Sequence, residues 1–306
     1  MENNNLNKHN LVKILSLIIV VVFIGLGVFL LRNQKTIEPL QLKNNLTAKT
    51  LNQTPDLEEV IRPMEGIILP VTWADLGAQL VKAGVIDVDK FKSLYEERGT
   101  FPEEYQKLLL GHNPDRLKIT RANAGYLLNL FWALGLANKN SILDQGEMTD
   151  PKYGGAGGFA STGGWTMAKG DPMDHYSKHQ FFTLNSDQQM LVDKVSRGIY
   201  RPCCNNSTHF PDCNHGMAML GLLELLASQG ASEQEMWQTA LVVNAYWFPD
   251  TYLTIASYFK DQGFDWSELD PKEVLGVSYS SSAGSKRIVS LVSQSQGDRG
   301  GSSCGV

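Results

Sequence analysis

The order of apolar and polar positions divides the chain into an apolar run near the N-terminus, a polar stretch, and a long segment with helical periodicity. The apolar run, residues 14–31, is eighteen residues long and contains no charged side chain. As a helix it would span about 27 Å, close to the ~30 Å hydrocarbon core of a bilayer. We therefore predict that residues 1–32 form a cytoplasmic tail and a single transmembrane helix.

This predicted helix has the features of an uncleaved signal anchor. The run is longer than the apolar region of a cleaved signal peptide, and it ends Leu30-Leu31-Arg32 without the small residues of a cleavage site. Positive residues flank both sides and do not decide the orientation, but a short polar tail before a large C-terminal body is typical of an N-in anchor. We therefore expect a single-pass protein of the cell membrane with an extracytoplasmic C-terminal domain.

The rest of the chain predicts a mainly α protein. Residues 33–62 are rich in Asn, Gln and Thr without a persistent stripe, which is typical of a linker. Residues 63–285 show helical spacing interrupted by loops, and within them residues 122–137 and 216–228 are apolar nearly all round, as in buried central helices. Residues 286–306 are polar and Gly- and Ser-rich and are expected to be a flexible tail. The predicted fold is an irregular, loop-rich α-helical globular domain behind a transmembrane helix.

Local signals refine this interpretation. Ser232 and Glu235 have the spacing of a capping box, and the helix they open should end before Pro249. Alternation typical of strands is confined to Val71 with its apolar neighbours and to a weak run at residues 288–292. We therefore expect no substantial sheet.

Residues 150–175 form a different kind of region, because they contain GGAGG and GGW and show little periodicity. Loops of this length inside compact domains tend to be functional or disordered, and the aromatic residues here disfavour disorder. The segment matches the spacing of a dinucleotide-binding fingerprint from Gly155 to Ala160, but it follows Asp150-Pro151 rather than a strand, so we reject that function. The glycines are expected to let this loop pack closely over a site.

Charge excludes one class of function. The 306 residues carry a formal net charge of −5, and without residues 1–32 the remaining body carries −7. Phosphate neutralisation by Lys and Arg supplies most of the affinity of nucleic-acid-binding proteins, and this acidic body has no basic run. We therefore expect no nucleic-acid partner.

The strongest chemical signal is a cluster of cysteines and histidines. Three of the four cysteines, Cys203, Cys204 and Cys213, lie within eleven residues; His209 lies between them and His215 follows two residues after Cys213. Thiolates and imidazoles together suit zinc, copper and iron. We predict a metal centre with Cys203, Cys204, Cys213 and His215 as ligands and His209 as a further candidate. Zinc is the expected ion, with copper or iron as alternatives, and the role is structural or supports redox chemistry.

A second pair, His175 and His179, is expected to join this centre. If their segment is helical, the two imidazoles project from one face at i, i+4 spacing. Four of the six histidines of the chain lie between residues 175 and 215, close to three of its four cysteines. We therefore interpret His175 and His179 as further ligands of a shared metal centre.

Two other interpretations of the cysteines remain open. An extracytoplasmic location permits disulfides, and the cysteines then staple a binding module. Either Cys203 is joined to Cys204, or Cys213 is joined to one of them and the other is left for the fourth cysteine, Cys304. Alternatively, Cys213 is the reactive thiolate of an oxidoreductase or transferase. In that case the helix that follows, expected to be capped by Asn214, lowers the pKa of the thiol, and His209 or His215 acts as base. The sequence specifies no substrate.

Overall fold

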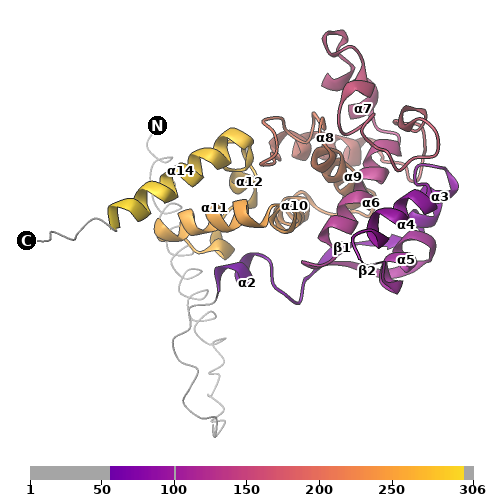
Figure 1. The fold of residues 1–306 in the computed structure, drawn as a ribbon. Coiled ribbons are helices and arrows are strands. Elements are labelled where there is room, and N and C mark those ends of the chain that lie inside the picture. Colours follow the sequence, from indigo (N-terminus) through magenta and orange to yellow (C-terminus); the bar gives the residue numbers. More distant parts are fainter. Residues whose placement is uncertain (1–55, 100, 300–306) are drawn as a thin grey trace, which may run out of the picture. The chain divides into compact units, whose positions relative to one another are not determined.

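The computed structural model describes residues 56–99 and 101–299, all within a compact unit that starts at Gln53. Figure 1 shows this part as mainly helical, which confirms the predicted fold class at that level. The elements, in chain order, are α2 Leu57–Ile61, β1 Ile67–Ala74, α3 Leu76–Lys82, α4 Val88–Glu96, α5 Glu103–Leu110, β2 Asn113–Ile119, α6 Ala124–Ala137, α7 Ser141–Gln145, short 3-10 turns between residues 147 and 174, α8 Ser186–Gly198, α9 Asn214–Ser228, α10 Glu233–Trp247, α11 Pro249–Asp261, the 3-10 turn Trp266–Glu268, α12 Pro271–Val274, α13 Val277–Ser280 and α14 Ser282–Arg299.

The predicted transmembrane helix and signal anchor are corrected by the structure. No helix within residues 56–99 and 101–299 is long and apolar enough to cross a bilayer. The most apolar ones, α6 and α9, have 14 and 15 residues, and at 1.5 Å per residue they are shorter than a ~30 Å hydrocarbon core. Residues 14–31, on which the prediction and the extracytoplasmic placement depended, lie outside the described residues.

A small sheet departs from the predicted pattern. Strands β1 and β2 pair antiparallel, from Ile67 opposite Ile119 to Ala74 opposite Asn113. In β1 buried side chains alternate with more exposed ones from Ile68 onward, and the strand includes Val71, where the sequence shows some alternation, and the buried Trp73. In β2 only the last residues include buried apolar side chains, so the sequence carries too little alternation to reveal the strand.

The C-terminal end is also more ordered than its composition predicts. Helix α14 runs from Ser282 to Arg299, so the segment expected to be a flexible tail from residue 286 is helical as far as Arg299. Ile288, in the run expected to be a weak strand, is buried in the core on this helix. Contact between α14 and α11 supplies the apolar burial that the polar composition conceals.

The core is built around α6 and α9, the two helices that the sequence predicts to be buried. They cross where Gly135 meets Gly221: a Cβ atom at either position would come closer than 3.0 Å to backbone atoms of the other helix. Only glycine permits such a close approach of two backbones. Beyond the crossing, Asn138 at the end of α6 hydrogen-bonds Glu224 of α9, so the two helices run in the same general direction.

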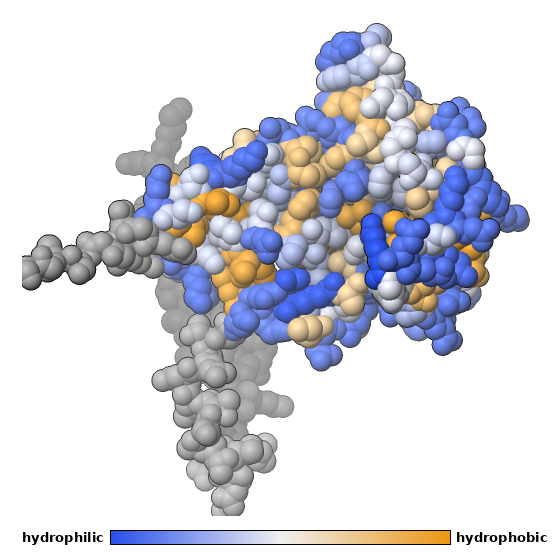
Figure 2. All heavy atoms as spheres, in the orientation of Figure 1, coloured by the Kyte–Doolittle hydropathy of each residue, from blue (hydrophilic) through white to orange (hydrophobic). Residues whose placement is uncertain are grey.

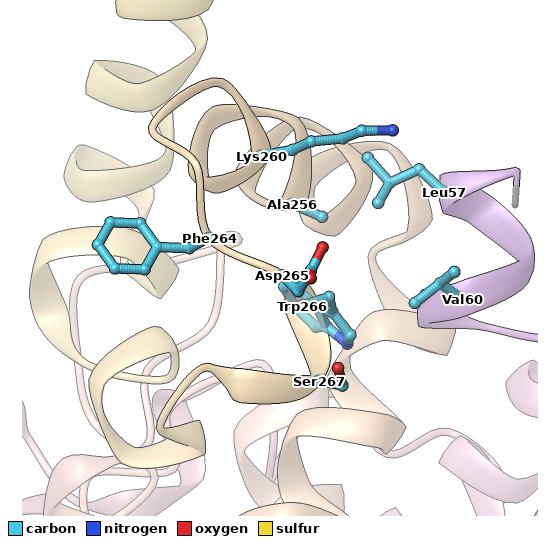
Figure 3. A pocket seen from close by; sticks show the side chains of 8 residues that line it. All are labelled: Leu57, Val60, Ala256, Lys260, Phe264, Asp265, Trp266 and Ser267. Carbon is cyan, nitrogen blue, oxygen red and sulfur yellow. The ribbon is translucent and has the colours of Figure 1, made fainter. Parts of the chain in front are cut away.

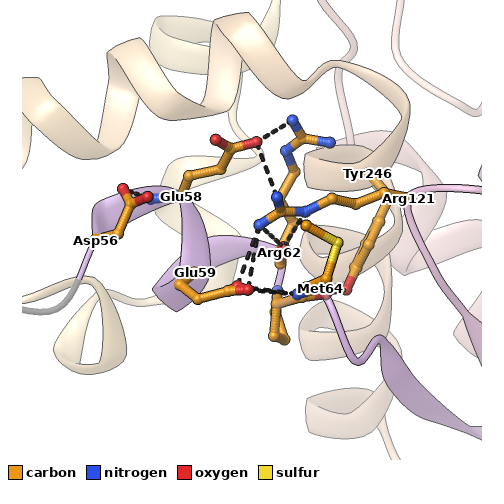
Figure 4. A network of polar contacts seen from close by, with 8 residues as sticks. Asp56, Glu58, Glu59, Arg62, Met64, Arg121 and Tyr246 are labelled. Carbon is orange, nitrogen blue, oxygen red and sulfur yellow. Dashed lines mark hydrogen bonds and ion pairs between the residues drawn. The ribbon is translucent and has the colours of Figure 1, made fainter.

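Helix α2 lies within the stretch predicted to be a linker, and it is fixed to the domain by Arg121. The Arg121 guanidinium forms ion pairs with Glu58 and Glu59 and donates to the carbonyl oxygen of Arg62 (Figure 4). A cavity of about 190 Å³ lies between α2 and α11, with Leu57 and Val60 along one side (Figure 3). The surface in Figure 2 is mainly hydrophilic with small separate hydrophobic patches.

Candidate metal centre

The cysteine segment is a loop that connects α8 to α9 and is held against the end of α8. The backbone N–H of Thr208 donates to the carbonyl oxygen of Ile199, and that of His209 donates to the carbonyl oxygen of Ser196. The N–H of Tyr200 donates to the carbonyl oxygen of Leu275. These bonds fold the loop back on itself, so residues near its two ends meet.

Arg201 is the buried centre of this loop, with a side chain only 1% exposed. Its Nε donates to Cys213 Sγ at 3.2 Å, and its Nη1 donates to the carbonyl oxygen of Asn206 at 2.8 Å. Its Nη2 donates to the carbonyl oxygen of Phe210 and to Asp212 Oδ1 at 2.9 Å. Every arm of the guanidinium therefore organises the segment that carries the cysteines.

Cys213 is the N-cap of α9, one residue earlier than the sequence predicts, and its Sγ accepts a hydrogen bond from the N–H of Gly216. Gly216 also makes room for Arg201, because a Cβ atom at this position would overlap the guanidinium group. The guanidinium cannot easily yield, since it is buried and fully hydrogen-bonded. The start of α9 and the position of Arg201 therefore depend on each other.

The three thiols of the loop are free and gather around Cys213. Cys203 Sγ lies 3.4 Å from Cys213 Sγ, and Cys204 Sγ lies 3.9 Å from it. His215 completes one set with Cys203 and Cys213, in which the potential ligand atoms all lie within 4.8 Å of one another. Among the described residues a second set of this kind joins Cys204, Asp212 and Cys213. Cys213 is common to both.

The charge distribution favours a thiolate at Cys213 and a neutral ring at His215. Hydrogen bonds from the Cys203 and Cys204 thiols, with the Arg201 guanidinium alongside, hold the pKa of Cys213 well below its usual range. Burial lowers the pKa of His215 to about 4, and the Arg201 charge acts in the same direction. A thiolate and a neutral imidazole are the forms that ligate metals.

The His215 ring is positioned by aromatic packing and keeps one nitrogen without a partner. Its centre lies 4.4 Å from the Phe248 ring and 6.0 Å from the Trp247 ring. Its Nδ1 is buried and has no hydrogen-bond partner among the described residues. A buried unpaired nitrogen is costly unless a ligand or ion satisfies it.

Asp212 is close to the cysteines but is poorly suited to be a ligand. Its Oδ1 accepts from Arg201 and its Oδ2 accepts from Asn206 Nδ2 at 2.8 Å. Both oxygens are therefore occupied in holding the loop. Of the predicted ligands, the structure joins Cys203, Cys213 and His215 in one set, whereas Cys204 shares a set with Cys213 and Asp212 and not with His215.

The segment of His175 and His179 is not the α-helix on which the i, i+4 argument depended. A 3-10 turn ends at Asp174, and the chain passes through Ser177 with a positive φ of 52°. The two rings still meet, with His175 Nδ1 2.9 Å from His179 Nε2. Neither residue belongs to the sets of three potential ligands found among the described residues.

The geometry of this histidine pair fits a hydrogen bond better than a chelate. The ring centres are 5.2 Å apart with planes inclined by 25°, so the two nitrogens face each other end on. His175 Nε2 donates to the carbonyl oxygen of Lys169, which leaves His175 Nδ1 to accept from His179 Nε2–H. Two imidazoles on one tetrahedral zinc have nitrogens about 3.4 Å apart and lone pairs that converge on the ion.

His209 also has a partner away from the cysteines. Its Nε2 pairs with Asp193 Oδ1 of α8 at 2.8 Å, and it too is absent from the ligand sets of the described residues. The structure therefore joins His215 to the cysteines and gives His175, His179 and His209 other partners. A centre shared by all of them is not formed in this geometry.

The glycine-rich loop packs against the cysteine loop, as expected from its composition. The N–H of Ser161 donates to the carbonyl oxygen of Asp212 at 3.3 Å, and the Phe159 ring contacts the Phe210 ring. A cavity of about 340 Å³ lies beside this contact, with Trp132 and Asn214 among its lining residues. Asn214 stands between Cys213 and His215 in the chain, but neither the three cysteines nor His215 is among the residues that line this cavity.

Sequence reasoning missed the two residues that organise the site, Arg201 and Asp212. Both charged residues lie inside the cysteine segment, Arg201 directly before Pro202 and Asp212 directly before Cys213. A charge within such a segment is a detectable signal, but its partner is set by how the loop folds. No family model, curated protein or solved structure matches this chain.

Proposed function

We propose that this protein binds one zinc ion at the cluster of Cys203, Cys204, Cys213 and His215, and that the ion fixes the loop between α8 and α9. A set of three thiolates and one imidazole is a common four-ligand composition for structural zinc. The ligands come from both ends of the loop and from the first turn of α9, so one ion would hold these parts together.

The observation that carries this proposal is the spacing of the sulfur atoms. Zinc–sulfur bonds of about 2.3 Å in a tetrahedron place two sulfurs about 3.8 Å apart. The distances of 3.4 Å and 3.9 Å from Cys213 Sγ to the other two thiols bracket this value. A ring nitrogen of His215 lies within 4.8 Å of the sulfurs of Cys203 and Cys213 and supplies a nitrogen donor.

Charge balance supports the same ligand set. Three thiolates with one neutral imidazole around Zn²⁺ leave one negative charge. The buried guanidinium of Arg201, whose Nε donates to Cys213 Sγ, offsets that charge. Hydrogen bonds to ligating sulfurs orient and tune a metal site, so Arg201 is a supporting residue of the centre.

Metal titration of the full chain tests the proposal. The protein is purified with reductant, stripped of metal and titrated with Zn²⁺, and Co²⁺ is used in parallel because its visible bands report tetrahedral sulfur ligation. We expect one ion per chain by elemental analysis. The variants Cys213→Ser and His215→Ala should weaken binding by at least about 100-fold, more than the loss of an outer-shell partner costs.

The matched control is His179→Gln, which removes a histidine of the other pair and should leave the stoichiometry and affinity unchanged. A metal-free protein in which all three thiols titrate as free would overturn the proposal. If His179→Gln lost zinc while His215→Ala kept it, the proposed assignment of the ligands would be wrong.

A further inference from the structure

A second chemistry is suggested by the exposed thiol of the cluster. Cys203 is exposed, whereas Cys213 beside it is half-buried, and their sulfurs are 3.4 Å apart without a bond. A disulfide requires about 2.05 Å between the sulfurs. Forming the bond therefore requires the two sulfurs to approach each other by about 1.4 Å.

The third thiol is less suited to this bond. Cys204 Sγ lies 3.9 Å from Cys213 Sγ and is also within hydrogen-bond distance of the carbonyl oxygen of Asn206. Its backbone carbonyl accepts from the N–H of Ser282 at the start of α14. This attachment holds Cys204 in place, whereas Cys203 is exposed and lies nearer to Cys213.

We propose that the cluster, when free of zinc, reduces low-molecular-weight disulfides by closing a Cys203–Cys213 bond, and that this bond and zinc exclude each other. The proposal rests on the zinc site described above, because both states use the sulfurs of Cys203 and Cys213.

The reaction balances with a disulfide RSSR as oxidant. The Cys213 thiolate, placed by Arg201 Nε–H and the Gly216 N–H, attacks one sulfur of RSSR and releases RS⁻. Cys203 then loses its proton to the departing thiolate and attacks Cys213 Sγ, which releases the second RS⁻. One protein thiolate and one protein thiol are oxidised to a disulfide, and RSSR is reduced to one RSH and one RS⁻, which takes its proton from water. In the zinc-loaded protein the same two thiolates are ligands, so their oxidation releases Zn²⁺.

Oxidised glutathione is the probe for the test. Metal-free and zinc-loaded full chains, both with Cys304→Ser, are mixed with it, and free thiols, glutathione adducts by mass spectrometry, and zinc captured by a chromogenic chelator are followed over time. Cys204→Ser should still close the disulfide, within about twofold of the parent rate. Cys203→Ser should close it at least about tenfold more slowly and accumulate glutathione on Cys213, because its nearest resolving thiol is gone.

The outcomes separate this inference from the zinc site. Oxidation of Cys203→Ser as fast as the parent, or thiol loss in the loaded protein without zinc release, overturns the inference and leaves the zinc site standing. Disulfide closure in a protein that never binds zinc overturns the zinc site, and the claim of mutual exclusion with it. One zinc released per disulfide formed supports both.

Discussion

Two groups of side chains with metal-binding chemistry lie in this domain, and they differ in whether their potential donors are already occupied. In the histidine pair, His175 and His179 bond to each other and His175 donates to a backbone carbonyl. In the cysteine cluster, sulfurs converge on Cys213 while the Nδ1 of His215 has no partner among the described residues. The comparison shows that residue type nominates a site, while unsatisfied, converging donors distinguish a binding site from a structural contact.

The contacts that hold the two groups in place also differ. The cysteine cluster is organised by a buried cation, Arg201. The histidine segment is held by backbone bonds from the N–H of His179 to the carbonyl oxygen of Ala137 and from the N–H of Lys139 to that of His179. Behind this contact, Asn138 donates to the buried carboxyl of Glu224. One support is ionic and the other is mainly backbone pairing with a neutral buried acid.

The largest expected effect comes from removing the cation of the cysteine cluster. Arg201→Met leaves Asp212 and the Cys213 thiolate without their buried partner, and breaking such a pair costs about 3–5 kcal/mol. Urea unfolding of the metal-free protein measures it. The control is Arg197→Met, whose exposed ion pair with Asp193 contributes about 1 kcal/mol or less. Equal effects of the two variants would refute the central role of Arg201.

Substitutions where α6 and α9 cross should change the stability of the domain without changing metal binding. Gly135→Ala places a Cβ atom against the backbone of α9, and overpacking of this kind costs about 1–3 kcal/mol. Gly125→Ala, near the start of α6 where a Cβ atom meets no neighbour within 4 Å, should be neutral or stabilise by up to about 1 kcal/mol. Because the crossing lies within α9 beyond the cluster, zinc stoichiometry should stay at one ion in both variants.

The buried carboxyl of Glu224, which accepts from Asn138 behind the histidine segment, predicts that the free energy of unfolding depends on pH. Burial raises the pKa of Glu224 well above its usual range, so with rising pH the unfolded chain loses this proton before the folded one does. Stability contributed by this group therefore falls as pH rises above about 4.3, by about 1.4 kcal/mol per pH unit while the folded carboxyl stays protonated. Glu224→Gln should become progressively more stable relative to the parent as pH rises.

Unfolding in urea from pH 4.5 to pH 7.5 measures that difference. The control Glu235→Gln should differ from the parent by a nearly constant amount over this range, because hydrogen bonds from Ser232 lower the pKa of the Glu235 carboxyl and its contribution changes mainly below about pH 4.5. A pH-independent difference for Glu224→Gln would mean that the carboxyl is ionised inside the core.

The smallest effect concerns the histidine pair. Burial, with His175 nearby, lowers the pKa of His179, so between that pKa and about 6.5 the unfolded state binds more protons. Stability from this group is present above pH 6.5 and falls as pH drops through that value, by about 0.5 kcal/mol or less because the ring is partly exposed. His179→Asn should lose this dependence between pH 7.5 and 5.5, and a larger acid sensitivity in the variant would contradict it.

Much of the domain could be predicted from local pattern. Helices α6 and α9 are apolar nearly all round, and the structure buries both. The capping box of Ser232 and Glu235 forms at the start of α10, because its spacing alone brings the two groups together. The order of three cysteines and His215 was likewise enough to nominate the ligands, since loop ends and a helix start are close in the chain.

The partners of isolated residues could not be predicted in this way. The His175–His179 pair, the burial of Glu224 and the contact between α14 and α11 depend on segments far apart in sequence. The burial of Glu224 beside Asn138 depends on how α6 and α9 cross at Gly135 and Gly221, and no spacing along the chain encodes that crossing. The transmembrane prediction rested on hydropathy alone, and the described helices contain none that is long and apolar enough to cross a bilayer.

By itself the sequence determined which residues have metal-binding chemistry and which helices are buried, because residue type and helical period are local properties. The tertiary structure decided which of those residues are free to bind. It hydrogen-bonded the His175 and His179 rings to each other and His209 to Asp193, and it placed Arg201 against Cys213. A side chain becomes a ligand only if folding leaves its donor atom unsatisfied and aimed at others, and that depends on the packing of distant segments.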